Sequence, residues 1–567
     1  MPGGQRTERT CGCHAAGTIG CAVRGAIMSA AARPTAQAVS RPLVGGGTQV
    51  HGRPAGALPL ALGIGALDLV LGLYINVQLH YLNGDAFSRV ANAYYVLYGR
   101  NPHLAAIGFI WNPLPSVMEL PFLFLRSVWP ALAADAVASL FVSAAFAGIA
   151  VYYLSDTLRL FGLGTVWRIT FALLFACNPM IAFYSANGMS DIMLVGAMAA
   201  AVRGTVGYVL QSSLADLIAA GVWLAVAFGI RYEGAPLGVF LALGLGIALW
   251  WLQRGAREIR GGMLLLLAPL LYVSGLWVYL NWLIMKQPLY FLDSAYGNVA
   301  QTSMGLATTL AGAQHHIVGS LLFVAHMGLL FWPVAVGLVA AVALSVGKWR
   351  DPIAPVLIGA TVGMPLLQVA LVFEGHSGGW ARYFIYYIPN GILLLAFAAS
   401  RVRRTLARNA ALIVAALLCI GGNGVNLYEE TNSPVVGYGD TEPFTGILAG
   451  KRFVTYRTDD QIATYLDRHP KLTVLLDSFD GYPIVLRVRN PRQLIITSDT
   501  DFQSVLENPA GRVDALLVPQ PDGDATLDAV NRSFPKLWAG GVPWAHLMAS
   551  FPGGTAWRLY GVGAGAP

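Results

Sequence analysis

The chain of 567 residues is 56% hydrophobic and only 11% charged, with a formal net charge of +7. An ordinary soluble domain has about 25% charged residues, and a soluble fold of this size could not bury so much apolar surface. The composition therefore excludes an ordinary soluble protein and predicts a polytopic α-helical membrane protein. Nucleic-acid binding is not indicated, because 18 of the 36 basic residues fall in the N-terminal tail and in loops that we expect to be cytoplasmic.

The N-terminal segment differs from the rest of the chain. Residues 1–56 are rich in Gly, Ala, Arg, Thr and Pro without periodicity, which predicts a disordered cytoplasmic tail. Met28 is an alternative first residue. The spacing of Cys11, Cys13 and Cys21 could suggest a metal site, but a fourth ligand is missing, so incidental cysteines are favoured.

Residues 57–430 predict a transmembrane domain. A helix needs about 20 apolar residues to cross about 30 Å of hydrocarbon. Eleven stretches qualify, at 57–80, 132–154, 165–184, 189–210, 213–230, 235–252, 262–283, 317–345, 353–373, 382–400 and 408–427. The segment 111–125 is nearly as apolar, but Pro113, Pro115 and Pro121 interrupt it, and we expect a re-entrant or interfacial helix there.

Arginine and lysine predict which side each loop faces, because cytoplasmic loops are enriched in both. Placing the basic loops and the tail inside puts residues 81–131 and the C-terminal domain on the extracytoplasmic side. In a rival layout the tail is translocated and 111–125 is a true span, which moves Asp85 to the inner side. The basic loops contain Arg159 with Arg168, Arg203, Arg254 with Arg257 and Arg260, Lys348 with Arg350, and Arg401 with Arg403, Arg404 and Arg408.

Residues 440–567 predict a soluble domain of mixed α/β class. Amphipathic segments indicate helices at 458–469, 500–511 and 524–534. Short apolar runs indicate strands at 471–479, 492–498, 514–520, 546–551 and 555–562. Their order suggests a partly parallel sheet.

The segment GDAFSRVANAYYVLYGRNPH after the first span predicts a helix in the membrane interface. Phe87, Val90, Tyr94, Leu97 and Tyr98 recur at helical spacing on one face, which we expect to lie in the headgroup zone. Asp85, Arg89 and Asn92 share another face. The alternative is purely structural, with Asp85 capping the helix and pairing with Arg89 at i+4.

Several stretches, in order, resemble the GT-C superfamily of integral-membrane glycosyltransferases, which includes protein O-mannosyltransferases and aminoarabinose transferases. They cover most of the membrane domain: GDAFSRVANAYYVLYGRNP, WNPLPSVMELPF, NPMIAFYSANGMSD at 178–191, GIRYEG at 229–234, NWLIMKQPLYFLDSAYG at 281–297 and GWARYFIYYIP at 379–389. The resemblance implies transfer of a sugar from a polyprenyl-phosphate donor to an acceptor hydroxyl, on the extracytoplasmic side and with inversion.

The resemblance also implies roles for residues. Asp85 matches the acidic residue of the first outer loop, which acts as general base on the acceptor. The leaving phosphate needs charge compensation, and Arg89, Arg231 and Arg382 are the outer candidates. For Arg231 and Arg382 the alternative is that an arginine at a span end simply snorkels to the interface.

Further residues near these motifs are candidates for acceptor binding or support. Asp191 matches an acidic position of the family or caps a helix, and Glu233 could pair with Arg231. Glu374 and His376 could line the acceptor pocket or bind a divalent cation, and Tyr383 lies next to Arg382. No cofactor is otherwise indicated.

The expected partners are the lipid bilayer, a polyprenyl-phosphate sugar, and a glycan, lipid or protein acceptor. The Ala and Gly content fits a bacterial plasma-membrane protein, for which arabinosyl and mannosyl donors are both plausible. Two other classes remain. A transporter or flippase would place ionisable residues near the middle of spans, whereas the ionisable residues here cluster at span ends. A membrane-anchored sensor would carry its specificity in the C-terminal domain.

Overall fold

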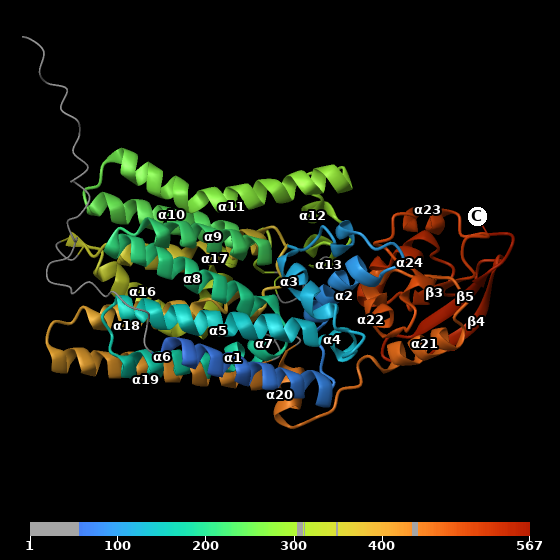
Figure 1. Cartoon of the computed structure of the whole chain (residues 1–567), viewed down its shortest axis with the longest axis horizontal. Helices are drawn as coiled ribbons and strands as arrows, with labels where there is room; N and C mark the ends of the chain where they lie inside the picture. The colour runs from blue at the N-terminus through green and yellow to red at the C-terminus, as the bar shows by residue number, and fades with distance from the viewer. Residues whose placement is uncertain (1–55, 303–309, 311, 348–349, 434–439, 567) are drawn as a thin grey trace, which may run out of the picture. The chain divides into compact units, whose positions relative to one another are not determined.

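The computed structural model describes residues 56–302, 310, 312–347, 350–433 and 440–566, so the N-terminal tail and its cysteines lie outside the described residues. Its membrane part is helical (Figure 1). The helices up to residue 302 are α1 (Ala57–Leu73), α2 (Gly84–Tyr98), α3 (Leu114–Leu123), α4 (Ala131–Ala134), α5 (Val137–Leu160), α6 (Thr165–Ala176), α7 (Pro179–Ala186), α8 (Ser190–Gln211), α9 (Leu214–Ile230), α10 (Gly234–Trp251), α11 (Ala256–Met285), α12 (Tyr290–Asp293) and α13 (Asn298–Thr302). The later ones are α15 (Ile317–Leu330), α16 (Trp332–Ala343), α17 (Ala354–Phe373), α18 (Tyr387–Ser400) and α19 (Thr405–Asn432).

All eleven predicted spans are helical. Among the described residues, 8 helices are long and apolar enough to cross a membrane, or up to 10 if the bent pairs α6 with α7 and α15 with α16 each count as one span. The remaining predicted span is α9, which has 17 residues. The chain is therefore a multi-pass membrane protein. Helix α3 has only 10 residues, and this length agrees with the expectation that 111–125 does not cross fully.

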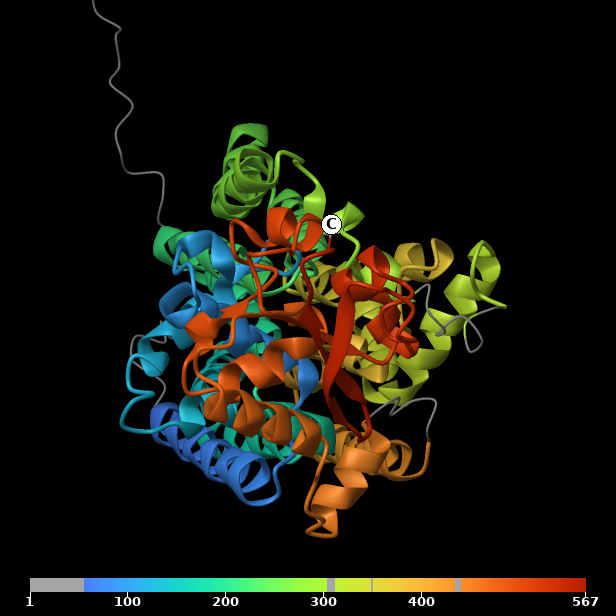
Figure 2. The ribbon, with the colours of Figure 1, turned by 90° about the vertical axis from the view of Figure 1, so that its right-hand side faces the viewer.

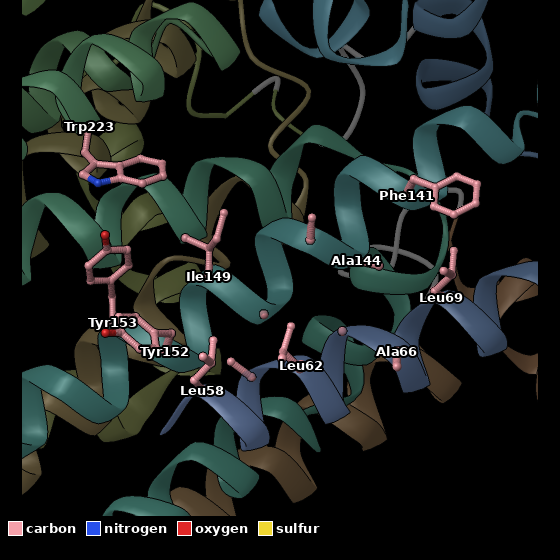
Figure 3. Close-up of a pocket in the computed structure, with 14 residues that line it drawn as sticks. Leu58, Leu62, Ala66, Leu69, Phe141, Ala144, Ile149, Tyr152, Tyr153 and Trp223 are labelled. Carbon is pink, nitrogen blue, oxygen red and sulfur yellow. The ribbon is translucent and has the colours of Figure 1, made fainter. Parts of the chain in front are cut away.

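Small residues let neighbouring spans approach closely. A Cβ atom added at Gly65 of α1 would lie 2.9 Å from the Ala144 carbonyl oxygen of α5, and one added at Gly148 would lie 2.9 Å from that of Ala61. Such contacts are typical of membrane helices, whose association depends on close packing rather than on the hydrophobic effect. A mainly apolar pocket of about 500 Å³ lies beside this contact, between Leu62, Ile149 and Trp223 (Figure 3). We assign it to the lipid-facing body, because its lining contains no Asp, Glu, Lys, Arg or His side chain.

The C-terminal residues form the predicted α/β domain. Its sheet has the order β2-β1-β3-β5-β4, with parallel pairing of β1 to β2 and β3, and antiparallel pairing of β5 to β3 and β4. Figure 2 shows these strands in red with the orange helices beside them. The elements are α20 (Thr441–Leu448), α21 (Arg457–Arg468), β1 (Val474–Leu475), α22 (Ser478–Arg487), β2 (Leu494–Ile495), α23 (Phe502–Glu507), β3 (Ala515–Pro519), α24 (Ala529–Ser533), β4 (Ala545–Phe551) and β5 (Trp557–Val562).

Two helices of this domain, α20 and α22, are absent from the sequence-based prediction. Helix α22 contains Gly481 and Pro483, which favour a turn when the sequence is read alone. The Asp477 side chain caps this helix by accepting a hydrogen bond from the Phe479 backbone N–H at 2.9 Å. Asp477, which lies inside the predicted strand 471–479, is therefore the N-cap of α22.

The C-terminal domain contacts the segment after the first span. Arg100 pairs with Asp501 at 2.8 Å, and the Asn101 backbone N–H donates to Asp499 at 3.1 Å. The two regions therefore lie on the same side of the membrane. This overturns the rival layout, in which a true span at 111–125 separates them.

Candidate functional site

The site begins at the N-terminus of α2, just beyond the first span. Asn83 caps this helix, and its side-chain oxygen accepts from the Asp85 backbone N–H at 3.1 Å. The alternative role of Asp85 as the helix cap is therefore wrong. Its side chain is 56% exposed, and so it is accessible to a substrate. Because Asn83 satisfies the helix end, the Asp85 carboxylate is free for other partners.

Asp85 pairs with Arg382, which comes almost 300 residues later in the sequence. An Arg382 guanidinium nitrogen lies 2.9 Å from an Asp85 carboxylate oxygen, and only 9% of the Arg382 side chain is exposed. The guanidinium also stacks on the ring of Trp380 at 4.2 Å. A buried guanidinium held by one carboxylate and one ring is not a side chain that simply snorkels to the interface.

The charges around Asp85 keep it ionised. Loss of hydration by itself raises the pKa of Asp85, but the positive charge of Arg382, followed by that of Arg89, outweighs this effect and holds the pKa below its usual value. Arg382 makes the larger contribution and was not expected to contact Asp85.

Arg231 belongs to a second group of charges beside the first. It contacts Asp191 at 3.2 Å and Glu233 at 2.9 Å. The predicted pairing with Glu233 is confirmed, and Asp191 pairs with Arg231 instead of capping α8. The Tyr383 ring lies 5.6 Å from both the Arg231 and the Arg382 guanidinium carbon, so it separates the two cations.

Arg89 is buried close to these groups. The residue is 9% exposed, and no carboxylate lies within ion-pair distance of its guanidinium among the described residues. The predicted i+4 pair with Asp85 is therefore not formed at contact distance. The N–H groups of the Arg89 guanidinium are therefore available to bind a ligand, whereas those of Arg231 already bind two carboxylates.

Two acidic residues near the site went unnoticed in the sequence. Tyr184 donates a hydrogen bond to Asp440, whose pKa is raised by burial although the charge of Arg382 opposes the rise. Glu119 of α3 is fully buried beside Arg89, and neither of its carboxyl oxygens has a partner among the described residues. Burial raises the pKa of Glu119 well above its usual range, against the charge of Arg89.

Two further candidates follow α17. Glu374 is exposed at the C-terminal end of α17, and His376 is half-buried in the following turn. Among the described residues, no group of three or more His, Cys, Asp and Glu side chains could hold a metal ion.

The apolar face of α2 packs on protein. Phe87 is fully buried, with its ring 5.3 Å from that of Tyr456 and 5.4 Å from that of Tyr482. Val90 and Tyr94 are also fully buried. The prediction of a headgroup contact for this face is corrected, because the C-terminal domain covers Phe87 and the end of α3 with Arg126 covers Tyr94 and Tyr98. This packing fixes the helix that carries Asp85 and Arg89.

A solved structure has a similar overall fold at low sequence identity. The crystal structure of ArnT from Cupriavidus metallidurans bound to undecaprenyl phosphate matches with a TM-score of 0.51 and 12% identity, over 89% of this chain and 98% of that one. The chain therefore shares the overall fold of this structure. The predicted fold class is confirmed.

A weaker likeness is found to the oligosaccharyltransferase AglB from Archaeoglobus fulgidus in complex with an inhibitory peptide and a dolichol-phosphate. Its TM-score is 0.44 at 11% identity, over 81% of this chain and 69% of that one. Comparisons with family models and with curated proteins find no match. The fold assignment thus rests on the likeness to the ArnT structure.

Proposed function

We propose that the protein is a membrane glycosyltransferase, which transfers a sugar from a polyprenyl-phosphate donor to an acceptor hydroxyl with inversion. The observation that supports this most is the accessible Asp85 carboxylate, paired at 2.9 Å with the buried Arg382 on a GT-C fold. The matched ArnT structure is bound to undecaprenyl phosphate, which supports a polyprenyl-phosphate carrier here.

In the proposed reaction Asp85 is the general base. Its carboxylate takes the proton of the acceptor hydroxyl while the hydroxyl oxygen attacks the anomeric carbon of the sugar. The bond from that carbon to the phosphate oxygen breaks, and its electron pair leaves with the phosphate. A phosphate anion needs no proton to leave, but it needs positive charge, which Arg382 and Arg89 supply.

The ion pair suggests how donor binding prepares the base. In the unliganded protein, Arg382 lowers the pKa of Asp85, and a carboxylate of low pKa is a weak base. A donor phosphate that binds Arg382 competes with Asp85 for the same guanidinium. Asp85 then loses part of its counter-charge, so its pKa rises and it accepts a proton more readily.

The side of the membrane is part of the proposal. The positive-inside pattern places the site and the C-terminal domain outside, and the cell envelope of a bacterium is the proposed setting. Cysteines introduced by Ser88→Cys and Ser433→Cys should both react with an impermeant maleimide added to intact cells. Reaction of neither cysteine until the membrane is opened would reverse the orientation.

A transporter or flippase is the alternative, and one residue favours it. Asp68 lies inside the first span and is 6% exposed, so it is an exception to the clustering of ionisable residues at span ends. Intramembrane carboxyls often mark transport pathways. A transporter should lose function with Asp68→Asn and keep it with Asp85→Asn, and a glycosyltransferase should show the reverse.

The proposed activity can be tested directly. Purified full-length protein is incubated with radiolabelled polyprenyl-phosphate sugars, arabinosyl and mannosyl donors among them, together with a membrane lipid extract as acceptor. Sugar transfer with release of the polyprenyl phosphate is expected for one donor class, and it should be absent with Asp85→Asn. Movement of the intact donor across a vesicle membrane, with no release of phosphate, would favour the flippase.

A further inference from the structure

A polar pocket of about 390 Å³ lies near the outer end of α1, beside the contact between the membrane helices and the C-terminal domain. Four parts of the chain form it: the residues after the first span, the connection from α4 to α5, the segment before α21, and helices α21 and α22. The lining residues are His80, Leu82, Ala134, Asp135, Arg452, Phe453, Val454, Tyr456, Arg457, Asp460 and Arg487.

This pocket shares none of its charged residues with the Asp85 site. Asp85, Arg89, Arg231 and Arg382 are absent from its lining. The two places are nevertheless close, because Tyr456 lines the pocket and its ring also packs on Phe87 of α2 at 5.3 Å. Leu82, which also lines the pocket, precedes Asp85 by three residues, so the pocket lies close to the start of the helix that carries this carboxylate.

The three arginines of the pocket differ in their partners. Arg487 pairs with Asp460 at 2.8 Å, and its guanidinium stacks over the Phe87 ring at 5.0 Å. Arg452 lies 2.7 Å from the His80 imidazole. The Arg457 guanidinium has no side-chain partner among the described residues. Arg452 and Arg457 are both exposed to solvent, and within the described part of the chain the only side chain that contacts the Arg452 guanidinium is that of His80.

The backbone around His80 is held in an uncommon conformation. His80 has a φ of 55°, in the left-handed region that residues other than glycine seldom adopt. The Phe453 backbone N–H donates to the Leu79 carbonyl at 2.7 Å, which ties this turn to the segment that carries Arg452. The contact holds His80 and Arg452 at the mouth of the same pocket.

The position of the pocket identifies the kind of ligand. The first span ends at Gln78, so His80 lies at the level of the lipid headgroups. Arginine binds phosphate through two parallel hydrogen bonds, which suits Arg452 and Arg457. The carboxylates of Asp135 and Asp460 can accept hydrogen bonds from hydroxyls. The pocket therefore matches a headgroup that combines one phosphate with several hydroxyls.

We propose that this pocket binds the phosphate and hydroxyls of a lipid headgroup, and that the bound lipid is the acceptor whose free hydroxyl reaches Asp85. The proposal that a lipid headgroup binds here depends only on the residues and the position of the pocket. The acceptor role rests on the proposed glycosyltransferase function. Arg452 and Arg457 hold the phosphate, and Asp135 orients the polyol.

Binding can be measured without any transfer reaction. Full-length protein in phosphatidylcholine nanodiscs is titrated with fluorescent phosphatidylglycerol, whose headgroup has one phosphate and two hydroxyls. Arg457→Gln should weaken binding by about tenfold, as expected for one charge-assisted hydrogen bond. Arg452→Gln with Arg457→Gln should weaken it further. Arg468→Gln, at the opposite end of α21, is the matched control and should bind like the original protein.

The outcomes separate the parts of the proposal. Equal binding by the original protein and the double variant would overturn the pocket as a lipid site. Displacement of the lipid by glycerol 3-phosphate at equal concentration would assign the pocket to a free phosphate compound instead. If the double variant loses lipid binding but transfers sugar with an unchanged KM for the acceptor, the acceptor role is wrong while the glycosyltransferase function stands. Thermal unfolding of each variant confirms that it is folded.

Discussion

Two charged clusters at opposite ends of the membrane helices show what separates a structural network from a site. At the end predicted to be cytoplasmic, Asp156 is shared by Arg159 at 2.6 Å and Arg203 at 2.5 Å, and Arg203 also pairs with Asp216. The carboxylates and guanidiniums of this inner cluster all have partners of opposite charge, which lie on α5, α8 and α9.

The outer cluster contains similar residues but leaves bonding capacity unused. One Asp191 oxygen and both Glu119 oxygens have no partner among the described residues. Arg89 is buried without an ion pair in that part of the chain, and Asp85 is half exposed. Buried polar groups normally have hydrogen-bond partners. Several such groups without partners at one place therefore indicate a binding site for a ligand. The inner cluster therefore holds helices together, whereas the outer cluster has polar groups that can bind a ligand.

The largest expected effect is on turnover when Asp85 loses its basicity. Asp85→Asn preserves size but cannot take a proton, so kcat should fall by about two to four orders of magnitude with donor affinity nearly intact. Steady-state transfer kinetics with a labelled donor measure both quantities.

A matched control comes from the neighbouring carboxylate. Asp191→Asn leaves Arg231 paired with Glu233, so a smaller loss of activity is expected. Near-normal transfer by Asp85→Asn would exclude it as the base. The candidates for the catalytic base would then be Asp191, Glu233, Glu374 and Asp440.

Arg382 should show a smaller effect, divided between binding and pH dependence. Arg382→Lys keeps the charge but loses the bidentate geometry, so KM for the donor should rise by about tenfold. Arg382 holds the pKa of Asp85 low, so its removal in Arg382→Ala should let this pKa rise. The acid limb of the kcat/KM profile should then move to higher pH. A profile that shifts to lower pH, or a donor KM unchanged in both variants, would remove Arg382 from the site.

The inner cluster should respond in stability rather than activity. Arg203→Gln leaves Asp216 without its partner, although Asp156 keeps Arg159. We expect a loss of about 2 kcal/mol in the free energy of unfolding, seen as a lower thermal midpoint in detergent, with kcat unchanged at low temperature. A large loss of kcat in folded protein would show that the two clusters are coupled and that the contrast between them is wrong.

The sequence could predict the spans and the sheet because apolar length and alternation are local patterns. It also pointed to Asp85, Arg231 and Glu233, which lie in short motifs. The pairing of Asp85 with Arg382 could not be predicted, because nothing local links residues so far apart. Glu119 could not be identified as a site residue from the sequence, because burial without a partner is a property of the packed structure.

The smallest expected effect concerns Asn83, and it tests whether the position of Asp85 depends on its helix cap. Asn83 accepts hydrogen bonds from two backbone N–H groups at the start of α2. Asn83→Ala removes this cap, which costs about 1 kcal/mol, while the burial of Phe87 against the C-terminal domain still holds the helix. Transfer activity should fall less than about threefold, since a carboxylate on a well-packed helix keeps its place when one end frays by a single turn. Asn83→Asp is the control, because aspartate caps as well as asparagine and should restore stability. A loss of activity as large as that of Asp85→Asn would mean that Asn83 contacts substrate, and that the first turn of α2, rather than one carboxylate, forms the site.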